Sequence, residues 1–129
     1  MPKPPIVSII DDDEAVREAT KGLIRSLGYV AVTFASSEEF LDSGRMHDTS
    51  CLITDVQMPG LSGVELQDAL IARGNRMPTI FVTAFGEERI RRRALEAGAI
   101  AFLDKPFEEE RLIEHLESAL QGRKDASAG

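Results

Sequence analysis

Five short hydrophobic segments alternate with five amphipathic segments along the chain. The hydrophobic segments are continuous rather than alternating, which is typical of strands buried on both faces of a parallel sheet. They cover residues 6–10, 29–34, 51–54, 78–84 and 100–103. The strict succession of strand and helix predicts helices on both faces of that sheet, joined by right-handed crossovers. The predicted fold class is therefore α/β, a doubly wound five-stranded parallel sheet with five helices.

The amphipathic segments have hydrophobic residues spaced three and four apart, as in helices that bury one face. The first packs through residues 16–27 and ends at Gly28, the second starts at Ser36-Ser37-Glu38-Glu39, the third packs through residues 64–71 and ends at Gly74, and the last two cover about residues 87–97 and 108–120. Residues 42–50 are expected to finish the second helix and form a loop. Residues 122–129 are small and polar without a pattern, so a domain of residues 1–121 is expected to precede a C-terminal tail or the start of a linker.

The composition narrows the class of protein. With 22 acidic against 15 basic residues the formal charge is −7, which argues against direct nucleic-acid binding by this domain. The single cysteine, Cys51, lies in a hydrophobic segment and can form no disulfide framework. The sequence has neither a signal peptide nor a hydrophobic run long enough to cross a membrane, so we expect a cytoplasmic domain without membrane contact.

Chemically distinctive residues follow four of the predicted strands. Asp11 and Asp12 come after the first, Asp55 after the third, and Lys105 after the fifth, while Thr83 closes the fourth. All strands of a parallel sheet point the same way, and sites form at the edge outside their carboxyl ends. The sequence therefore predicts that three carboxylates, one hydroxyl and one ammonium group share that edge.

Such a group of carboxylates needs a cation. Two carboxylates about 4 Å apart repel by roughly 4 kcal/mol at an effective dielectric near 20, and one lysine does not neutralise three. Hard oxygen ligands with positions left open suit Mg²⁺, with Mn²⁺ able to substitute. A metal ion, an ammonium group and a hydroxyl around a free carboxylate form a pocket for a phosphoryl group. We expect Asp55 to be the nucleophile, because it stands alone on a central strand while Asp11 and Asp12 form a pair.

These motifs, taken together and in order, resemble a response-regulator receiver domain of two-component signalling over residues 6–121. The matching residues are Asp11-Asp12, Asp55-Val56-Gln57-Met58-Pro59-Gly60, Ser62-Gly63, Thr83-Ala84, Ala97-Gly98-Ala99 and Phe102-Leu103-Asp104-Lys105-Pro106-Phe107. The last segment is most similar to the FixJ-like branch of nitrogen-fixation regulators. The resemblance implies a flavodoxin-like strand order 2-1-3-4-5.

The resemblance also implies roles for the site residues. Asp55 would accept a phosphoryl group from a sensor histidine kinase. Asp12, Asp55 and the backbone carbonyl of Gln57 would hold Mg²⁺, with Asp11 acting partly through water. Lys105 would pair with the phosphoryl group, and its peptide bond to Pro106 would be cis.

The resemblance further implies a phosphorylation-activated switch rather than an enzyme, one that catalyses only its own phosphorylation and dephosphorylation. Thr83 would move toward the phosphoryl group and Phe102 would turn inward behind it. The surface of the fourth helix, fifth strand and fifth helix would then change, and it would control a partner, a homodimer or an output domain in transcription regulation. Phe102 has a second interpretation as a fixed core residue.

Two other functions remain open at this point. A haloacid-dehalogenase-like phosphatase uses an Asp after the first strand and another two residues later, a spacing that Asp11 and Asp13 have. Ala15 stands where that family has Thr or Val, however, and 129 residues leave no room for its cap. The second alternative is a pseudo-receiver, an interaction module that never takes a phosphoryl group.

The two last helices carry opposite charges. Arg89, Arg91, Arg92 and Arg93 lie on the fourth predicted helix, and Glu108, Glu109, Glu110, Glu114 and Glu117 on the fifth. Two solvated faces explain this pattern simply. The sharper hypothesis is that the charges pair across a homodimer that forms on phosphorylation.

Overall fold

Strands and helices alternate along the chain. The computed structural model describes residues 4–84 and 86–128, and of residues 122–128 only the backbone is described. The elements are β1 (Ile6–Ile10), α1 (Glu14–Ser26), β2 (Val30–Phe34), α2 (Ser37–Ser43), η1 (Arg45–His47), β3 (Cys51–Asp55), α3 (Gly63–Ala72), β4 (Thr79–Thr83), α4 (Glu88–Glu96), β5 (Ala101–Asp104) and α5 (Glu109–Ala128). The predicted succession is confirmed. The one addition is η1, a short 3₁₀ helix inside the region expected to form a loop.

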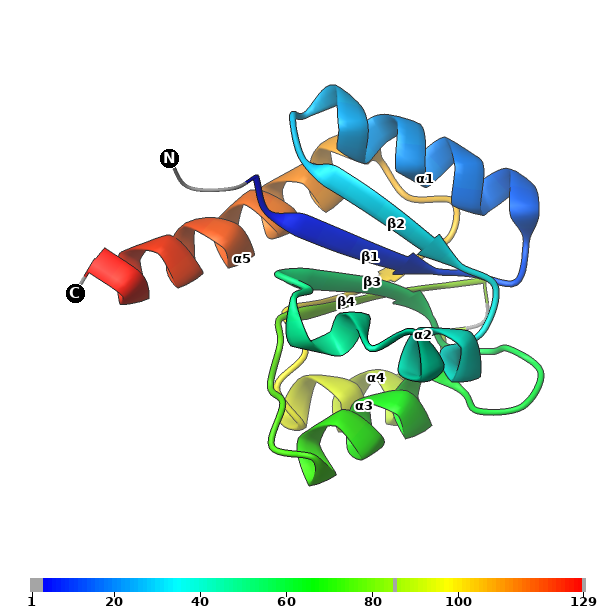
Figure 1. The fold of residues 1–129 in the computed structure, drawn as a ribbon. Coiled ribbons are helices and arrows are strands. Elements are labelled where there is room, and N and C mark those ends of the chain that lie inside the picture. The colour runs from blue at the N-terminus through cyan, green and yellow to red at the C-terminus, as the bar shows by residue number, and fades with distance from the viewer. Residues whose placement is uncertain (1–3, 85, 129) are drawn as a thin grey trace.

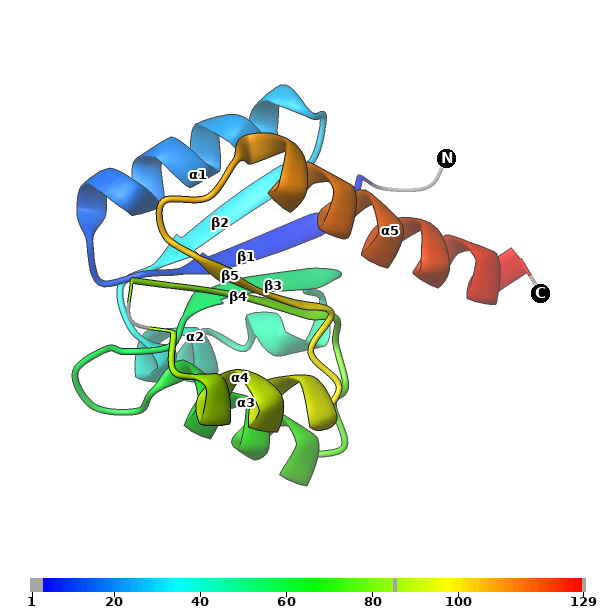
Figure 2. The same cartoon turned by 180° about the vertical axis from the view of Figure 1, so that it is seen from behind.

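The five strands form one parallel sheet in the order β2-β1-β3-β4-β5, as predicted. Helices α1 and α5 cover one face of the sheet, and α2, α3 and α4 cover the other (Figures 1 and 2). The order places β1, β3 and β4 side by side in the middle. Their carboxyl ends, followed by Asp11, by Asp55 and by Thr83, therefore meet at one edge.

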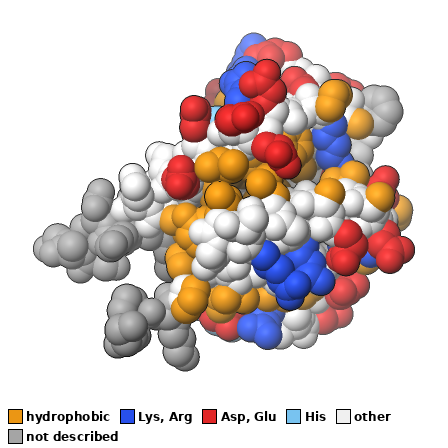
Figure 3. Space-filling view, turned by 90° about the horizontal axis from the view of Figure 1, so that it is seen from above, with side chains coloured by type: hydrophobic (Ala, Val, Ile, Leu, Met, Phe, Trp, Pro, Cys, Tyr) orange, Lys and Arg blue, Asp and Glu red, His pale blue; other side chains and the backbone are white. Residues whose placement is uncertain are grey.

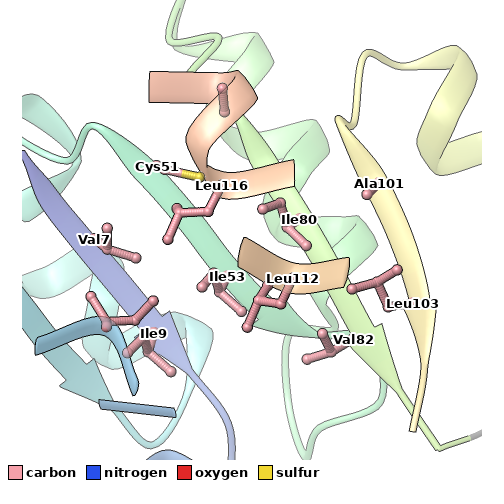
Figure 4. Close-up of a cluster of buried hydrophobic side chains, with 12 residues drawn as sticks. Val7, Ile9, Cys51, Ile53, Ile80, Val82, Ala101, Leu103, Leu112 and Leu116 are labelled. Carbon is pink, nitrogen blue, oxygen red and sulfur yellow. The ribbon is translucent and has the colours of Figure 1, made fainter. Parts of the chain in front are cut away.

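The core beneath α1 and α5 is a single hydrophobic cluster. It joins every second residue of the central strands to the inner face of α5, as Figure 4 shows for Ile9, Ile53 and Val82 around Leu112. Leu112 and Leu116 are fully buried. Cys51 is fully buried in this cluster, so its side chain packs as part of the core. Each strand is thereby fixed against the helices just before it reaches the edge.

The opposite face has two smaller clusters. One gathers Phe40 of α2, Leu66 and Leu70 of α3 and neighbouring residues, with Phe34 edge-on to Phe40 at 5.2 Å between ring centroids. Phe40 is fully buried, whereas Leu41 is only partly so. The other cluster is composed of Val56, Val64, Phe81, Ala94 and Phe102, and it connects β4 and β5 to α4.

Helix starts define the geometry of the edge. Asp13 caps α1, and its carboxylate accepts a hydrogen bond from the backbone N–H of Val16 at 3.2 Å. Ser62 caps α3 in a reciprocal arrangement with Glu65. Helix α1 therefore begins directly after Asp11 and Asp12, whereas α3 begins at the far end of the loop that follows Asp55.

The C-terminal boundary differs from the prediction. We expected the last helix to end near Leu120, but α5 continues to Ala128. Its inward-facing hydrophobic residues stop at Leu120, so periodicity contains no signal for the remainder. The sequence after Leu120 mixes good helix formers such as Arg123 and Lys124 with poor ones such as Gly122 and Asp125, so propensity alone does not predict the extension either. This extension lies beyond the amino ends of the strands (Figures 1 and 2). The division into residues 1–121 and 122–129 stays a prediction.

Candidate functional site

Three carboxylates converge at the carboxyl edge of the sheet. Asp11, Asp12 and Asp55 each offer an oxygen, and these atoms all lie within 4.8 Å of one another. Asp11 and Asp55 are buried, with 2% and 7% exposure, whereas Asp12 is exposed. The predicted meeting of these residues at one edge is confirmed, and the group is open to solvent on the Asp12 side.

Lys105 bridges the two buried carboxylates. Its ammonium nitrogen lies 2.8 Å from Asp11 Oδ2 and 3.0 Å from Asp55 Oδ2. The lysine comes from the loop after β5, and its backbone N–H donates to the carbonyl of Thr83 at 2.8 Å. The Lys105–Pro106 peptide bond is cis, as the resemblance implied. The structure therefore joins residues 11, 55 and 105, which are far apart in the sequence, in one ion cluster.

The pKa of Lys105 reflects this position. Burial alone would lower it, but hydrogen bonds and charges from Asp11 and Asp55 outweigh burial and raise the pKa above its ordinary value. The ammonium group is therefore charged at every physiological pH. One positive charge against three carboxylates leaves the cluster negative.

The oxygens of the three carboxylates differ in availability. Asp11 Oδ1 accepts from the backbone N–H of Asp13 at 2.9 Å, and Asp55 Oδ1 accepts from that of Gln57 at 3.2 Å. Their Oδ2 atoms face Lys105. Asp12 makes no hydrogen bond or ion pair within residues 4–84 and 86–128. A cation would thus find its least engaged ligand at Asp12.

The loop from β3 to α3 wraps around Asp55. Residue 57 is tied back to the Asp55 side chain, and the N–H of Gly63 donates to the carbonyl of Val56 at 2.8 Å. A side chain at Gly63 would collide with the backbone carbonyl of Asp55, so only glycine lets α3 start this close to the strand end. The Ser62-Gly63 pair singled out in the sequence therefore has a steric reason.

The two residues predicted to act as switches lie on β4 and β5. Thr83 is fully buried and stands one residue beyond Val82, the β4 partner of Asp55. Phe102 is 7% exposed, and its ring lies 6.0 Å from that of Phe81 between centroids. The Phe102 ring therefore already lies inward, in the cluster that holds α4.

Two residues next to the site escaped sequence analysis. The Arg17 guanidinium of α1 donates to the backbone carbonyl of Asp11 at 2.8 Å. Glu38 was regarded only as a helix-start signal, but its carboxylate accepts from the N–H of Leu61 at 3.0 Å. Neither contact follows a periodic pattern, because each joins a helix to a loop end.

A hydrophobic hollow lies beside Lys105, between α1 and the start of α5. It measures about 450 Å³ and is lined by Val16, Ala19, Thr20, Leu23, Lys105, Pro106, Phe107 and Glu109. Seen from the α1 side, hydrophobic side chains form a band between an acidic and a basic area (Figure 3).

Within the described part of the chain, no helix has the length and hydrophobicity that a membrane span requires.

Comparison with known proteins decides the family. Residues 7–117 match the model of the response regulator receiver domain. The chain belongs to this family. Receiver domains act in general as phosphorylation-dependent signalling switches. The resemblance to this family, the predicted fold class and the predicted general function are thereby confirmed.

Relatives of this receiver domain include transcriptional regulators. It is 40% identical to the transcriptional regulatory protein FixJ of Azorhizobium caulinodans, with 97% of this chain and 62% of that protein covered. It is 39% identical to the response regulator protein TodT of Pseudomonas putida, with 90% and 51% covered. The chain thus spans only about half to two thirds of these relatives.

Solved structures agree with this assignment. The response regulator StyR superimposes with a TM-score of 0.87 and 42% identity, over 98% of this chain and 65% of StyR. The structure of FixJ-N gives a TM-score of 0.82 and 34% identity, over 93% of this chain and 96% of that structure. The similarity to the FixJ-like branch therefore holds in sequence and in fold.

Proposed function

We propose that this receiver domain accepts a phosphoryl group on Asp55 from a sensor histidine kinase. The observation that supports this most directly is the Lys105 ammonium group, which bridges Asp11 and Asp55 at 2.8 and 3.0 Å. The cation beside Asp55 would pair with an oxygen of an incoming phosphoryl group. Asp55 is also the carboxylate around which the β3–α3 loop is organised.

In the proposed step, an Asp55 carboxylate oxygen attacks the phosphorus of a phosphohistidine. The new P–O bond forms as the P–N bond breaks, and the imidazole keeps the electron pair of that bond and takes up a proton. The product is an acyl phosphate on Asp55 and a free histidine. Lys105 would move its contact from the Asp55 carboxylate to a phosphoryl oxygen.

Mg²⁺ fits this cluster, because its preferred ligands are oxygens and the three carboxylates exceed the single ammonium charge. Asp12, Asp55 and the Gln57 carbonyl would hold it, with Asp11 acting partly through water, and Mn²⁺ would substitute. The ion would supply charge neutralisation at the phosphoryl oxygens. Asp12, the least engaged carboxylate, would contribute most to its capture.

The haloacid-dehalogenase alternative is less well supported by the geometry. It requires Asp11 as nucleophile, but the Asp11 side chain is only 2% exposed against 10% for Asp55, and this mechanism gives Asp55 no role. It also requires Asp13 as acid–base group, whereas the Asp13 side chain caps α1. We therefore propose that the domain is no enzyme beyond its own phosphorylation and dephosphorylation.

The output of the switch is proposed to be a change around α4. Thr83 ends β4 one residue beyond Val82, the partner of Asp55, and Phe102 belongs to the cluster of Val56, Val64, Phe81, Ala94 and Phe102 that holds α4. Because this cluster is small, a shift of either residue would alter the surface of α4, β5 and α5. A partner, an output domain in transcription regulation, or a homodimer would respond to it.

The arginines of α4 are only partly available for such a homodimer. Arg93 pairs with Asp68 of α3, and Arg91 lies 3.8 Å from Glu88. Arg89 and Arg92 make no ion pair within the described residues. Beryllofluoride mimics the phosphoryl group, so analytical ultracentrifugation in its presence should show a homodimer at low salt that dissociates as salt is added. A monomer at low salt would contradict the charge-paired homodimer.

The phosphoacceptor is tested by labelling with carbamoyl phosphate and Mg²⁺. Wild type and Asp11→Asn should gain one acid-stable, base-labile phosphoryl group by intact mass, whereas Asp55→Asn should gain none. Label that persists in Asp55→Asn would contradict the proposal, and absence of label in wild type would favour the pseudo-receiver.

The docking of a kinase is tested separately by Ala19→Asp in the hydrophobic hollow. This variant should slow phosphoryl transfer from the kinase but should not slow labelling by carbamoyl phosphate.

A further inference from the structure

The β3–α3 loop, residues 56–62, is held at both ends, and one further polar contact joins it to α2 just before the α3 cap. Near Asp55 it is held through Gln57 and Val56, and at α3 through the cap formed by Ser62. Met58 and Leu61 pack on the hydrophobic cluster below. Within the described residues, the only hydrogen bond from this loop to an element other than β3 and α3 joins the N–H of Leu61 to Glu38 Oε2, at 3.0 Å.

The chain passes directly under the Glu38 carboxylate. Gly60 has φ of +79°, a conformation that favours glycine, and a side chain built there would collide with Glu38 Oε2. The loop backbone at Gly60 therefore lies next to the end of the Glu38 side chain. A substitution there would have to displace this carboxylate as well as adopt a positive φ.

The position of Glu38 on α2 suits this contact. It lies in the first turn, after the cap Ser36, where the partial positive charge of the helix favours a carboxylate. A hydrogen bond from a backbone N–H to a carboxylate is roughly twice as strong as a neutral one. Glu38 is itself exposed, so the core gains little from it.

We infer that Glu38 is a positioning residue for the metal site. By holding Leu61, it keeps the loop in the path that leaves residue 57 next to Asp55. The inference rests on the proposed function, in which the Gln57 carbonyl is a ligand of Mg²⁺. Mg²⁺ tolerates little departure from octahedral geometry, so a loosened loop weakens binding.

The expected loss of Mg²⁺ affinity depends on how far Glu38 acts from the proposed metal ligands. Loss of a group that hydrogen-bonds directly to a metal ligand typically weakens affinity 10–100-fold, and Glu38 acts four residues further along the loop. Glu38→Ala should therefore raise the dissociation constant for Mg²⁺ about fivefold, below that range. Glu38→Gln should stay close to wild type, because its amide oxygen still accepts from Leu61.

The matched control is Glu39→Ala. Glu39 has the same charge, lies in the same first turn and is also exposed, but its side chain makes no hydrogen bond or ion pair within the described residues. If Glu38 acts on Mg²⁺ through its charge alone, the variants Glu38→Ala, Glu38→Gln and Glu39→Ala should all weaken Mg²⁺ binding to the same extent. If it acts through the hydrogen bond to Leu61, only Glu38→Ala should weaken Mg²⁺ binding.

The experiment is a calorimetric titration of the full chain with MgCl₂, with urea midpoints as a control for folding. Weakening confined to Glu38→Ala supports the inference, and equal affinities in all four proteins or equal weakening in the three variants overturn it. A second readout is the rate of labelling by carbamoyl phosphate against Mg²⁺ concentration. Glu38→Ala should need more Mg²⁺ for half-maximal rate yet reach the wild-type maximum.

The outcomes separate this inference from the proposed function. Wild type that binds Mg²⁺ and is labelled on Asp55, with Glu38→Ala unchanged, overturns the inference alone. Wild type that neither binds Mg²⁺ nor is labelled overturns the proposed function, and the positioning role falls with it.

Discussion

The central strands pass through two regions of opposite chemistry. Beneath α1 and α5, residues such as Ile9 and Ile53 belong to one hydrophobic cluster without a charge. Two residues beyond each of them, Asp11 and Asp55 belong to a cluster of three carboxylates and one ammonium group. The first region removes hydrophobic surface from water, whereas the second keeps like charges together. We conclude that stability resides mainly in the first and that the second gives up stability for its chemistry.

The largest effect should come from the hydrophobic region. Leu112→Ala removes a fully buried side chain at the centre of the α5 contact, and such changes typically cost about 2–5 kcal/mol. Urea denaturation measures it. Asp55→Asn is the matched change in the charged region and should alter the free energy of unfolding by less than about 1 kcal/mol. An Asp55→Asn cost as large as that of Leu112→Ala would break the comparison.

Within the charged region, Lys105 should matter most for stability. Lys105→Gln leaves Asp11 and Asp55 facing each other without the ammonium group, and we expect a loss of about 1–3 kcal/mol. The side chain is 19% exposed, which keeps the loss below that of a fully buried pair. Lys21→Gln is the control, because its contact with Glu18 is long and exposed. Equal losses in both variants would contradict the role of the ion cluster.

The stability difference between wild type and Lys105→Gln should also depend on pH. Since the pKa of Lys105 is raised above its unfolded value of 10.5, its contribution is complete below pH 10.5 and is lost as pH rises through the folded pKa. The difference in unfolding free energy between wild type and Lys105→Gln should therefore be flat from neutral pH to about pH 10 and shrink above it. A difference that already shrinks between pH 7 and 9 would contradict the assigned sign.

A metal ion should reduce the contrast between the regions. At a Mg²⁺ concentration ten times its dissociation constant, binding to the folded state alone adds about 1.4 kcal/mol. Thermal melts with MgCl₂, matched in ionic strength by NaCl, measure this gain. Leu112→Ala should show the same gain as wild type, since its core lies apart from the ligands. A gain missing from Leu112→Ala would mean that the regions are coupled.

Much of this arrangement could be predicted because it depends on local periodicity and topology. Continuous hydrophobic segments determined the strands, and a parallel sheet then had to bring Asp11, Asp55 and Lys105 to one edge. The strand order and the cis bond at Pro106 needed the resemblance, since several orders satisfy the same pattern. The general function likewise required the set of motifs rather than any single residue.

The remainder depends on contacts that no sequence period records. The hydrogen bond that the Leu61 N–H donates to Glu38 spans 23 positions and joins the β3–α3 loop to the first turn of α2, and Arg17 donates to a backbone carbonyl rather than to a charged partner. Sequence patterns show which face of a helix is buried, but they do not show which polar side chain reaches a particular loop. The extension of α5 to Ala128 was missed because the sequence after Leu120 has neither a hydrophobic period nor a uniform helix propensity.

The smallest expected effect has the most informative sign. Asp12 is exposed and makes no hydrogen bond within the described residues, yet its oxygen lies within 4.8 Å of those of Asp11 and Asp55. Asp12→Asn should therefore stabilise the metal-free protein by a few tenths of a kcal/mol through relief of repulsion, and added salt should reduce that gain. Melts in EDTA measure it.

With Mg²⁺ the order should reverse. Asp12→Asn loses the least engaged ligand, so saturating Mg²⁺ should stabilise wild type by more than the variant and leave the variant the less stable of the two. Asp55→Asn relieves the same repulsion but gives up a contact with Lys105, so it should gain less than Asp12→Asn without metal. If Asp12→Asn is destabilised in EDTA, repulsion is not what sets the charged edge apart from the core. A reversal on adding Mg²⁺ would instead mean that one exposed carboxylate costs stability in the free protein and supplies it in the metal-bound one.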